Sequence, residues 1–252
     1  MANLRLLFYV SSIGAKVPSD VHVPGADLLV LAAFDPELAP LRPLLGDHLA
    51  ARVGGRTVVA RTAGVGLAGS AAGAARHLVD VAPGAVVLVG SCGAYASAAL
   101  AIGDVVVGRT LRLVDLASLD GLAEFPPPMA TRLETDARLS EALAAFEFAG
   151  PPRARASACA ACVATTLAIT VDDAAALRIA AAVGADVEHL EAHGVATACA
   201  ARGVPFAVVL GVANLVGSRG RAEWLVHHLH AEAAAGAHVR EWLREGAQVE
   251  CA

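Results

Sequence analysis

The sequence predicts an α/β fold, with helices covering both faces of a central mixed and twisted sheet. Apolar segments of strand length recur without polar alternation, which is typical of strands buried on both faces. Alanine-rich helical segments separate these strands, and neither an internal repeat nor a domain linker is visible. With 252 residues, of which 56% are hydrophobic and 17% charged, the chain can bury a large core. We expect a single three-layer α/β/α domain over residues 1–252, in which residues 1–27 form an N-terminal extension whose place in the fold the sequence does not define.

The apolar run Leu28–Ala33 predicts the first strand of the core. A helix should start directly after it, with Asp35 as the N-cap and Pro36 at the first helical position. Pro40 and Pro43 should shorten or distort this helix, because proline lacks the N–H that a helix interior needs. Further along, the pattern predicts a hairpin of strands 51–53 and 57–63 around Gly54-Gly55, a helix over 67–81, a buried strand over 85–90, and another strand within 102–108.

The hydrophobic pattern that predicts strands and helices is weak between residues 115 and 155. In this segment Pro126–Pro128 predicts a loop, and residues 136–148 predict a modest helix. The pattern resumes with a strand over 163–169, after which Asp172 or Asp173 should cap a helix that reaches Val183. The last elements predicted are a helix over 192–201 that ends at Arg202-Gly203, a buried strand over 205–212, and a final helix from about 221 to 245.

Composition excludes several classes of partner. The net charge of −5, the lack of a basic cluster and the few aromatic residues argue against nucleic acid. No apolar run approaches the roughly 18 residues of a membrane helix. The run Leu6–Val10 is too short for a secretory signal, and an odd count of five cysteines fits a reducing compartment. We therefore expect a cytoplasmic protein with a small-molecule partner.

The spacing Cys159-x-x-Cys162 resembles a redox or zinc motif. A thioredoxin-like site would place it at a helix start, whereas here it precedes a predicted strand. His189 and His193 have i, i+4 spacing, but the glutamate between them is not in the position that HExxH requires. The sequence thus predicts no metal and no cofactor, with buried structural cysteines.

Polar residues return abruptly where two predicted strands end. Asn214 is the first polar side chain after the strand at 205–212, and Ser91 follows the strand at 85–90. In open α/β sheets ligands bind at the carboxyl ends of strands, so Asn214 is a candidate site residue. Gly64 and Gly66 lie between a strand and a helix, where backbone often approaches a ligand.

Four motifs follow one another along the chain: a strand followed by Asp35-Pro36-Glu37, Gly64-Val65-Gly66 before a helix, Gly90-Ser91-Cys92-Gly93 followed by Ile102-Gly103-Asp104, and Leu190-Glu191-Ala192 followed by a strand that ends near Asn214. Together they resemble the motifs of the nucleoside phosphorylase/nucleosidase superfamily. The segment Ala213–Trp224 is similar in particular to futalosine hydrolases, which carry a Ser-Asn-x-Val-Gly-Pro-Arg-Asp-Arg-x-x-Trp signature. The resemblance implies a nucleoside phosphorylase-like fold and cleavage of the N-glycosidic bond of a hypoxanthine nucleoside in menaquinone biosynthesis.

The resemblance assigns three catalytic residues to this chemistry, which needs a sugar clamp, a nucleophile and a leaving-group donor. Glu191 should accept hydrogen bonds from the ribose hydroxyls; otherwise it is a first-turn glutamate that complements a helix dipole. Glu37 should hold or deprotonate the attacking water; otherwise it is an exposed carboxylate. Asn214 stands where adenine-specific nucleosidases have an aspartate, and its amide suits a 6-oxopurine; otherwise it ends a strand in a turn.

The resemblance also implies a set of substrate-binding residues. Arg219 and Arg221 could pair with the carboxylate of an aromatic arm, or be solvated surface residues. Ile169 stands near the place of a base-stacking aromatic in many relatives, which weakens the prediction of the base pocket. The remaining predicted contacts are Gly64, Gly66, Ser91, Cys92, Gly93 and Leu190.

Leu210 departs from the family pattern, because relatives that use phosphate, and many that use water, carry an arginine there, and Ala213 replaces a serine. Without that cation, hydrolysis is favoured over phosphorolysis. The alternatives are a methylthioadenosine/adenosylhomocysteine nucleosidase, a purine nucleoside phosphorylase, and a catalytically silent nucleoside-binding protein. A homodimer or a higher homo-oligomer is expected from the resemblance and from the apolar composition.

Overall fold

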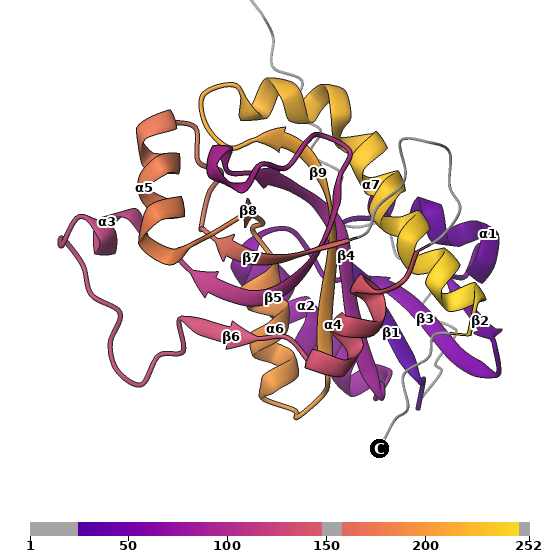
Figure 1. The fold of residues 1–252 in the computed structure, drawn as a ribbon. Helices are drawn as coiled ribbons and strands as arrows, with labels where there is room; N and C mark the ends of the chain where they lie inside the picture. Colours follow the sequence, from indigo (N-terminus) through magenta and orange to yellow (C-terminus); the bar gives the residue numbers. More distant parts are fainter. Residues whose placement is uncertain (1–24, 148–157, 247–252) are drawn as a thin grey trace, which may run out of the picture.

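The computed structural model describes residues 25–147 and 158–246, and one mixed sheet runs through the middle of this part of the chain (Figure 1). Residues 1–24 of the predicted N-terminal extension lie outside the described residues. The order along the sheet is β2 (Ala50–Val53), β3 (Arg56–Thr62), β1 (Leu28–Ala32), β4 (Ala85–Ala94), β8 (Val187–Glu188), β7 (Cys159–Thr165), β5 (Val105–Leu113) and β6 (Arg132–Glu134), and β9 (Phe206–Leu215) pairs with β4 in parallel and with β5 antiparallel.

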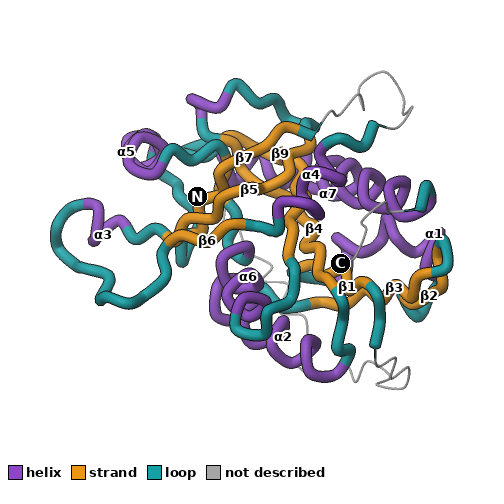
Figure 2. Tube along the Cα trace, turned by 60° about the horizontal axis from the view of Figure 1, so that its bottom comes forward, coloured by secondary structure: helices purple, strands orange, loops and turns teal. Residues whose placement is uncertain are grey.

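Helices cover both faces of the sheet, as the sequence predicts (Figure 2). One apolar cluster joins the sheet to α2 (Gly66–Asp80) and α6 (Ala192–Ala200). A second cluster, on the other face, joins it to the 3-10 helix η1 (Asp35–Leu41), α1 (Arg42–Leu45), α4 (Ala137–Ala144) and α7 (Gly220–Arg244). The remaining elements are η2 (Ala96–Ala98), α3 (Leu116–Leu119) and α5 (Asp173–Val183).

Strand β9 shows why the apolar runs lack alternation. Val208 and Leu210 point into the cluster with α2 and α6, whereas Ala207 and Val209 point into the cluster with α7. All four side chains are fully buried, so both faces of the strand need apolar residues. Leu210, which departs from the family pattern, is therefore a core residue.

Several predicted boundaries were wrong. Phe34, not Asp35, occupies the N-cap position, and Asp35 instead forms an ion pair with Arg42 at 2.8 Å. The segment is a 3-10 helix because Pro40 inside it cannot supply the N–H of a regular α-helix. Strands β4 and β9 extend to Ala94 and Leu215, past their predicted ends, because they pair with each other there despite an irregularity after Cys92.

The Cys-x-x-Cys segment also differs from its prediction. It begins β7, which ends at Thr165, so residues 167–169 lie beyond the strand. Cys159 is exposed rather than buried, and Cys162 is only partly buried. Side chains three positions apart on a strand point to opposite faces, which does not suit a shared metal or a disulfide. In the described part, no three His, Cys, Asp or Glu side chains gather into a metal-binding group.

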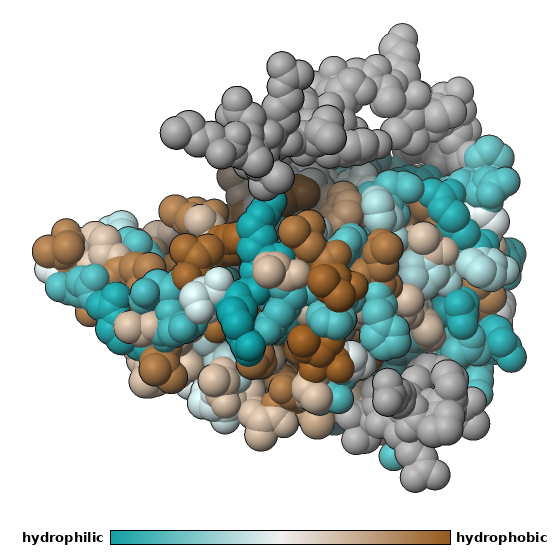
Figure 3. All heavy atoms as spheres, turned by 90° about the horizontal axis from the view of Figure 1, so that it is seen from above, coloured by the Kyte–Doolittle hydropathy of each residue, from teal (hydrophilic) through white to brown (hydrophobic). Residues whose placement is uncertain are grey.

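The start of α7 presents apolar side chains to solvent. Leu225, Val226 and Leu229 are all more than half exposed. Figure 3, which views the molecule from above, shows patches of apolar atoms between hydrophilic ones on this side. None of the described helices is both long and apolar enough to cross a membrane.

Candidate functional site

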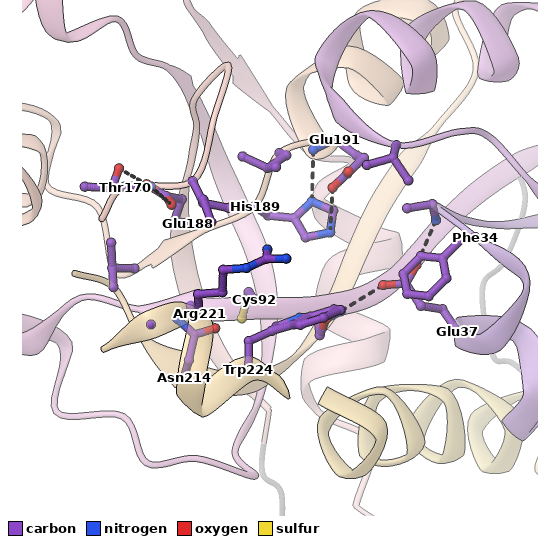
Figure 4. Close-up of a pocket in the computed structure, with 18 residues that line it drawn as sticks. Phe34, Glu37, Cys92, Thr170, Glu188, His189, Glu191, Asn214, Arg221 and Trp224 are labelled. Atoms are coloured by element: carbon purple, nitrogen blue, oxygen red, sulfur yellow. Dashed lines mark hydrogen bonds and ion pairs between the residues drawn. The ribbon is translucent and has the colours of Figure 1, made fainter. Parts of the chain in front are cut away.

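A cavity of about 270 Å³ opens near the carboxyl ends of β1, β4 and β9 (Figure 4). This is where the returning polarity of the sequence predicted a ligand site. Its lining includes most of the predicted site residues, brought together from six segments of the chain. These are Glu37, Ser91, Cys92, Gly93, Ile169, Leu190, Glu191, Asn214 and Arg221.

Glu37 is almost completely buried, with 3% of its surface exposed, so it is not the exposed carboxylate of the alternative interpretation. It lies in η1, and one carboxylate oxygen accepts a hydrogen bond from the backbone N–H of Ala33 at 2.8 Å. The other accepts from the N–H of Ser91 at 3.3 Å. Burial raises the pKa of Glu37 to about 8, aided by the negative charges of Glu232 and Glu191 and opposed by these backbone donors. Its proton is therefore exchanged close to neutral pH.

Glu191 is the second buried carboxylate, and it directly precedes α6. Its Oε1 accepts from the backbone N–H of Gly66 at 2.7 Å, and its Oε2 lies 3.4 Å from Nε2 of His189. Gly66 has φ +76°, a conformation that favours glycine, and it does not line the cavity itself. Gly64 also lies outside the lining; a Cβ there would be 3.2 Å from the carbonyl oxygen of Gly69. The predicted glycine pair thus shapes the turn and orients Glu191, and neither glycine lines the cavity.

His189 was missed as a site residue by sequence reasoning, which weighed it only as a metal ligand. Its side chain lines the cavity and is 4% exposed. Nδ1 accepts hydrogen bonds from the backbone N–H groups of Glu191 and Ala192, at 3.4 and 3.2 Å. Burial lowers the pKa of His189, although the charge of Glu191 opposes this effect, so the ring is neutral near pH 7.

Asn214 lines the opposite end of the cavity, close to the end of β9. Its amide nitrogen donates to the carbonyl oxygen of Leu215 at 2.8 Å. Gly93 makes this position possible, because a Cβ on Gly93 would lie 2.8 Å from that nitrogen and 2.9 Å from Cγ2 of Val216. The side chain is thus fixed by its own backbone and still borders the cavity.

Glu188 is a third buried carboxylate in the lining, and it was not predicted. It accepts hydrogen bonds from the backbone N–H of Thr170 at 2.9 Å, from the Thr170 hydroxyl at 2.5 Å and from the Tyr95 hydroxyl at 3.1 Å. These bonds tie the segment after β7 to β8 and hold Ile169 at the cavity, where it is 44% exposed.

Two aromatic rings, Phe34 and Trp224, also line the cavity and were not predicted as site residues. Figure 4 shows both on the side of Glu37. The indole N–H of Trp224 donates to Oγ of Ser91 at 3.2 Å, and the ring stacks on His228 with a centroid distance of 4.1 Å. His228 in turn contacts the buried Glu232 at 2.9 Å. The ring of Trp224 is therefore held by contacts along α7 and to β4.

The two predicted arginines are separated. Arg221 lines the cavity, and its guanidinium extends between Asn214 and His189 in Figure 4. Arg219 does not: its side chain is 73% exposed, pairs with Glu223 at 3.2 Å and borders a different cleft. Of the two predicted arginines, the structure thus places Arg221 at this cavity and Arg219 outside it, because α7 begins between them and turns them apart.

Cys92 is not suited to nucleophilic chemistry, although it lines the cavity. It is buried, and burial raises the pKa of its thiol far above neutrality. Cys92 therefore contributes an uncharged part of the cavity wall.

A scan against protein-family models matches residues 30–244 to the phosphorylase superfamily. A comparison with curated proteins gave no match. Among solved structures, a 5'-methylthioadenosine/S-adenosylhomocysteine nucleosidase from Neisseria meningitidis, in complex with methylthio-immucillin-A, is 22% identical, with a TM-score of 0.74, over 86% of this chain and 98% of that one.

Two further solved structures are similar to the same degree. Futalosine hydrolase of Helicobacter pylori is 18% identical, with a TM-score of 0.74, over 88% of this chain and 98% of that one. A 5'-methylthioadenosine/S-adenosylhomocysteine nucleosidase from Colwellia psychrerythraea, in complex with adenine, is 20% identical, with a TM-score of 0.74, over 88% of this chain and 96% of that one. These likenesses confirm the predicted three-layer fold.

Proposed function

The chain belongs to the phosphorylase superfamily, and from this premise we propose that it hydrolyses the N-glycosidic bond of a purine nucleoside, with futalosine as the favoured substrate. One observation carries the proposal. Two buried carboxylates, Glu37 and Glu191, are held by backbone N–H groups at one end of a cavity that has Asn214 at the other (Figure 4).

The carboxylate of Glu191 is placed to stabilise positive charge on the ribose during cleavage. Cleavage passes through a ribose with oxocarbenium character, and a fixed negative charge stabilises that state more than the ground state. Gly66 and His189 orient the carboxylate before any substrate is bound. In this proposal Glu191 accepts hydrogen bonds from the ribose hydroxyls and favours the developing positive charge.

Glu37 is the proposed base for the attacking water. A pKa of about 8 is close to the optimum for a base that works near neutral pH. Since only the ionised form accepts a proton, kcat/KM should rise with pH until about pH 8. Backbone donors from Ala33 and Ser91 fix the direction of the carboxylate.

Asn214 supports an oxopurine leaving group. An amide both donates and accepts hydrogen bonds, which matches the N–H and carbonyl pattern of hypoxanthine, whereas it cannot protonate adenine as an acid would. Ser91, Cys92 and Gly93 in β4 line the wall beside it. The indole of Trp224 and the ring of Phe34 supply apolar surface for the ligand.

Water is favoured over phosphate as the acceptor. Glu188 and Glu191 line the cavity, and their negative charges would repel a phosphate dianion. Among the described lining residues Arg221 alone carries a guanidinium, which extends between Asn214 and His189 in Figure 4. Leu210, which replaces the arginine of phosphate-using relatives, is buried in the core.

Arg221 supports a substrate with an anionic arm. It carries no ion pair to the carboxylates of the described residues, in contrast to Arg219. A carboxylate on the substrate would give its guanidinium a bidentate partner. Futalosine, which has a benzoate arm, fits this requirement and links the protein to menaquinone biosynthesis in the cytoplasm.

A methylthioadenosine/adenosylhomocysteine nucleosidase is the second candidate. The observation that favours it is the apolar part of the lining, formed by Phe34, Val65, Leu190 and Trp224, which would accept an alkylthio substituent. Exposed apolar residues at the start of α7, such as Leu225 and Val226, support a homodimer or a higher homo-oligomer in either case.

Incubation of the purified protein with futalosine, inosine and methylthioadenosine, with and without phosphate, tests the proposal. We expect hypoxanthine release from futalosine that does not depend on phosphate and that is lost in Glu191→Ala. Adenine release from methylthioadenosine alone would select the second candidate, and strict phosphate dependence a phosphorylase. Purine binding in calorimetry without turnover of any nucleoside would identify a silent binding protein.

A further inference from the structure

His189 lies between the two carboxylates that the proposed reaction uses. Its Nε2 is 3.4 Å from Oε2 of Glu191. A Cβ built on Gly90 would be 3.1 Å from the same nitrogen and 3.0 Å from Oε1 of Glu37, so both atoms crowd the bare Cα of Gly90. In Figure 4 the imidazole is drawn between the carboxylates of Glu37 and Glu191.

The proton of the imidazole has a defined position. Nδ1 faces two backbone N–H donors, those of Glu191 and Ala192, at 3.4 and 3.2 Å. A ring nitrogen that accepts from such donors has no proton of its own, so a neutral ring carries its proton on Nε2. That N–H group is the one next to Oε2 of Glu191. The start of α6 thus selects the tautomer that the carboxylate needs.

We propose that His189 is a positioning residue, which donates from Nε2 to Glu191 and holds that carboxylate toward the sugar, apart from Glu37. The proposal rests on the N-ribosyl hydrolase function, since it assigns His189 a part in that reaction. Oε1 of Glu191 is already fixed by the N–H of Gly66 at 2.7 Å. With His189 on Oε2, both oxygens of the carboxylate are oriented before the substrate arrives, as electrostatic stabilisation of a transition state requires.

A purely structural role is the competing explanation. Through Nδ1, His189 satisfies two N–H groups at the start of α6, which is the task of a helix cap. Two substitutions separate the roles, because the amide of asparagine reaches about as far as Nδ1 and that of glutamine about as far as Nε2. His189→Asn keeps an acceptor for the helix and loses the donor to Glu191, whereas His189→Gln does the opposite.

The test compares kcat, KM and the melting temperature of His189→Asn and His189→Gln with those of the wild-type protein on futalosine. We expect His189→Asn to melt close to wild type and to lose about 10- to 100-fold in kcat with little change in KM, as for a lost hydrogen bond to a charged group. His189→Gln should melt lower and recover most of that kcat. Higher activity in the asparagine variant than in the glutamine variant, equal losses in both, or wild-type kcat in both would overturn the proposal.

A second measurement keeps the inference testable if His189→Gln does not fold. Because His189 acts on ribose hydroxyls through Glu191, His189→Asn should lose several-fold less activity on 2′-deoxyinosine than on inosine. Equal losses on the two nucleosides would contradict the proposal.

If the wild-type protein cleaves no nucleoside, the proposed function fails, and nitrogen NMR of the imidazole then decides the positioning role. We expect the Nε2–H tautomer near pH 7, with an Nε2 resonance that shifts in Glu191→Gln. The opposite tautomer, or a resonance unchanged by that substitution, would overturn the inference by itself.

Discussion

The two ends of the cavity are built in different ways. At one end, which we call the carboxylate end, Glu37, His189 and Glu191 are buried and are held by backbone N–H groups. At the other, the amide end, Asn214 is half-buried and Arg221 is exposed. A preorganised, dry environment strengthens electrostatic effects, whereas an open one adapts to different ligands. The difference suggests that the carboxylate end performs the reaction and the amide end selects the substrate.

The largest effect should come from Glu191→Gln. An amide has the same shape, but it lacks the negative charge that stabilises an oxocarbenium-like ribose, so kcat should fall about 10²- to 10³-fold. If the carboxylate end serves the chemistry alone, the loss is the same for every ribonucleoside that the protein cleaves. Steady-state assays on futalosine and inosine measure this, with the exposed Glu124→Gln as the control. A loss confined to one nucleoside would assign Glu191 to selection instead.

The next effect concerns the stability of the carboxylate end. The pKa of Glu37 is raised from 4.5 to about 8, so the folded protein holds a proton that the unfolded chain has released. The free energy of unfolding contributed by this group is fully present below pH 4.5 and is lost as pH rises to about 8. Since one pKa unit corresponds to about 1.36 kcal/mol, the loss is on the order of 5 kcal/mol.

Urea unfolding at several pH values between 5 and 9 tests whether the free energy of unfolding falls as pH rises. Glu37→Gln, which has no proton to release, should flatten the decline in the free energy of unfolding and make the protein more stable than wild type at pH 8 to 9. The same variant should lose the rise of kcat/KM with pH. Equal slopes in Glu37→Gln and wild type would mean that Glu37 is ionised in the folded protein.

Sequence and structure agree best where burial dictates residue type. The apolar runs predicted the strands β1, β4 and β9 because both faces of each are covered by helices. The ends of β4 and β9 were missed because those strands extend by pairing with each other, a contact that no local pattern contains. Asp35 was misplaced because prolines turned the predicted helix into a 3-10 helix.

The residues of the candidate site also fall into those that the sequence predicted and those that it missed. Glu37, Glu191 and Asn214 were predicted from motifs of a family, and the structure brings them to one cavity. His189 and Glu188 were missed because they belong to or follow β8, a strand of only two residues that leaves no periodicity in the sequence. Their place depends on the packing of β8 between β4 and β7, which is known only from the fold. A helical i+3 spacing places Trp224 on the same side of α7 as Arg221, a signal that could have been used.

At the amide end, Asn214→Asp should change selectivity more than rate. A carboxylic acid can protonate a leaving adenine, whereas an ionised carboxylate is repelled by the carbonyl of an oxopurine. We expect the ratio of adenosine to inosine cleavage to rise about 10- to 100-fold, since one hydrogen bond to a charged group is typically worth 1.5–3 kcal/mol. Competition assays with both nucleosides in one vessel measure the ratio directly. An unchanged ratio with a reduced rate on both would place Asn214 in the common chemistry.

The smallest effect should come from Arg221→Ala, with Arg219→Ala as its matched control. Both are exposed residues near the start of α7, but only Arg221 borders the cavity, whereas Arg219 pairs with Glu223. An exposed ion pair to a substrate carboxylate is worth roughly 1 kcal/mol, so Arg221→Ala should raise KM for futalosine about fivefold. The value of kcat should not change. The KM for inosine should not change either, because inosine has no carboxylate. High salt should reduce the difference between wild type and Arg221→Ala, because it screens an exposed pair. If Arg219→Ala raises KM as much, or if inosine is affected equally, the selectivity of the amide end does not come from an anionic arm, and the lining beside Asn214 must supply it.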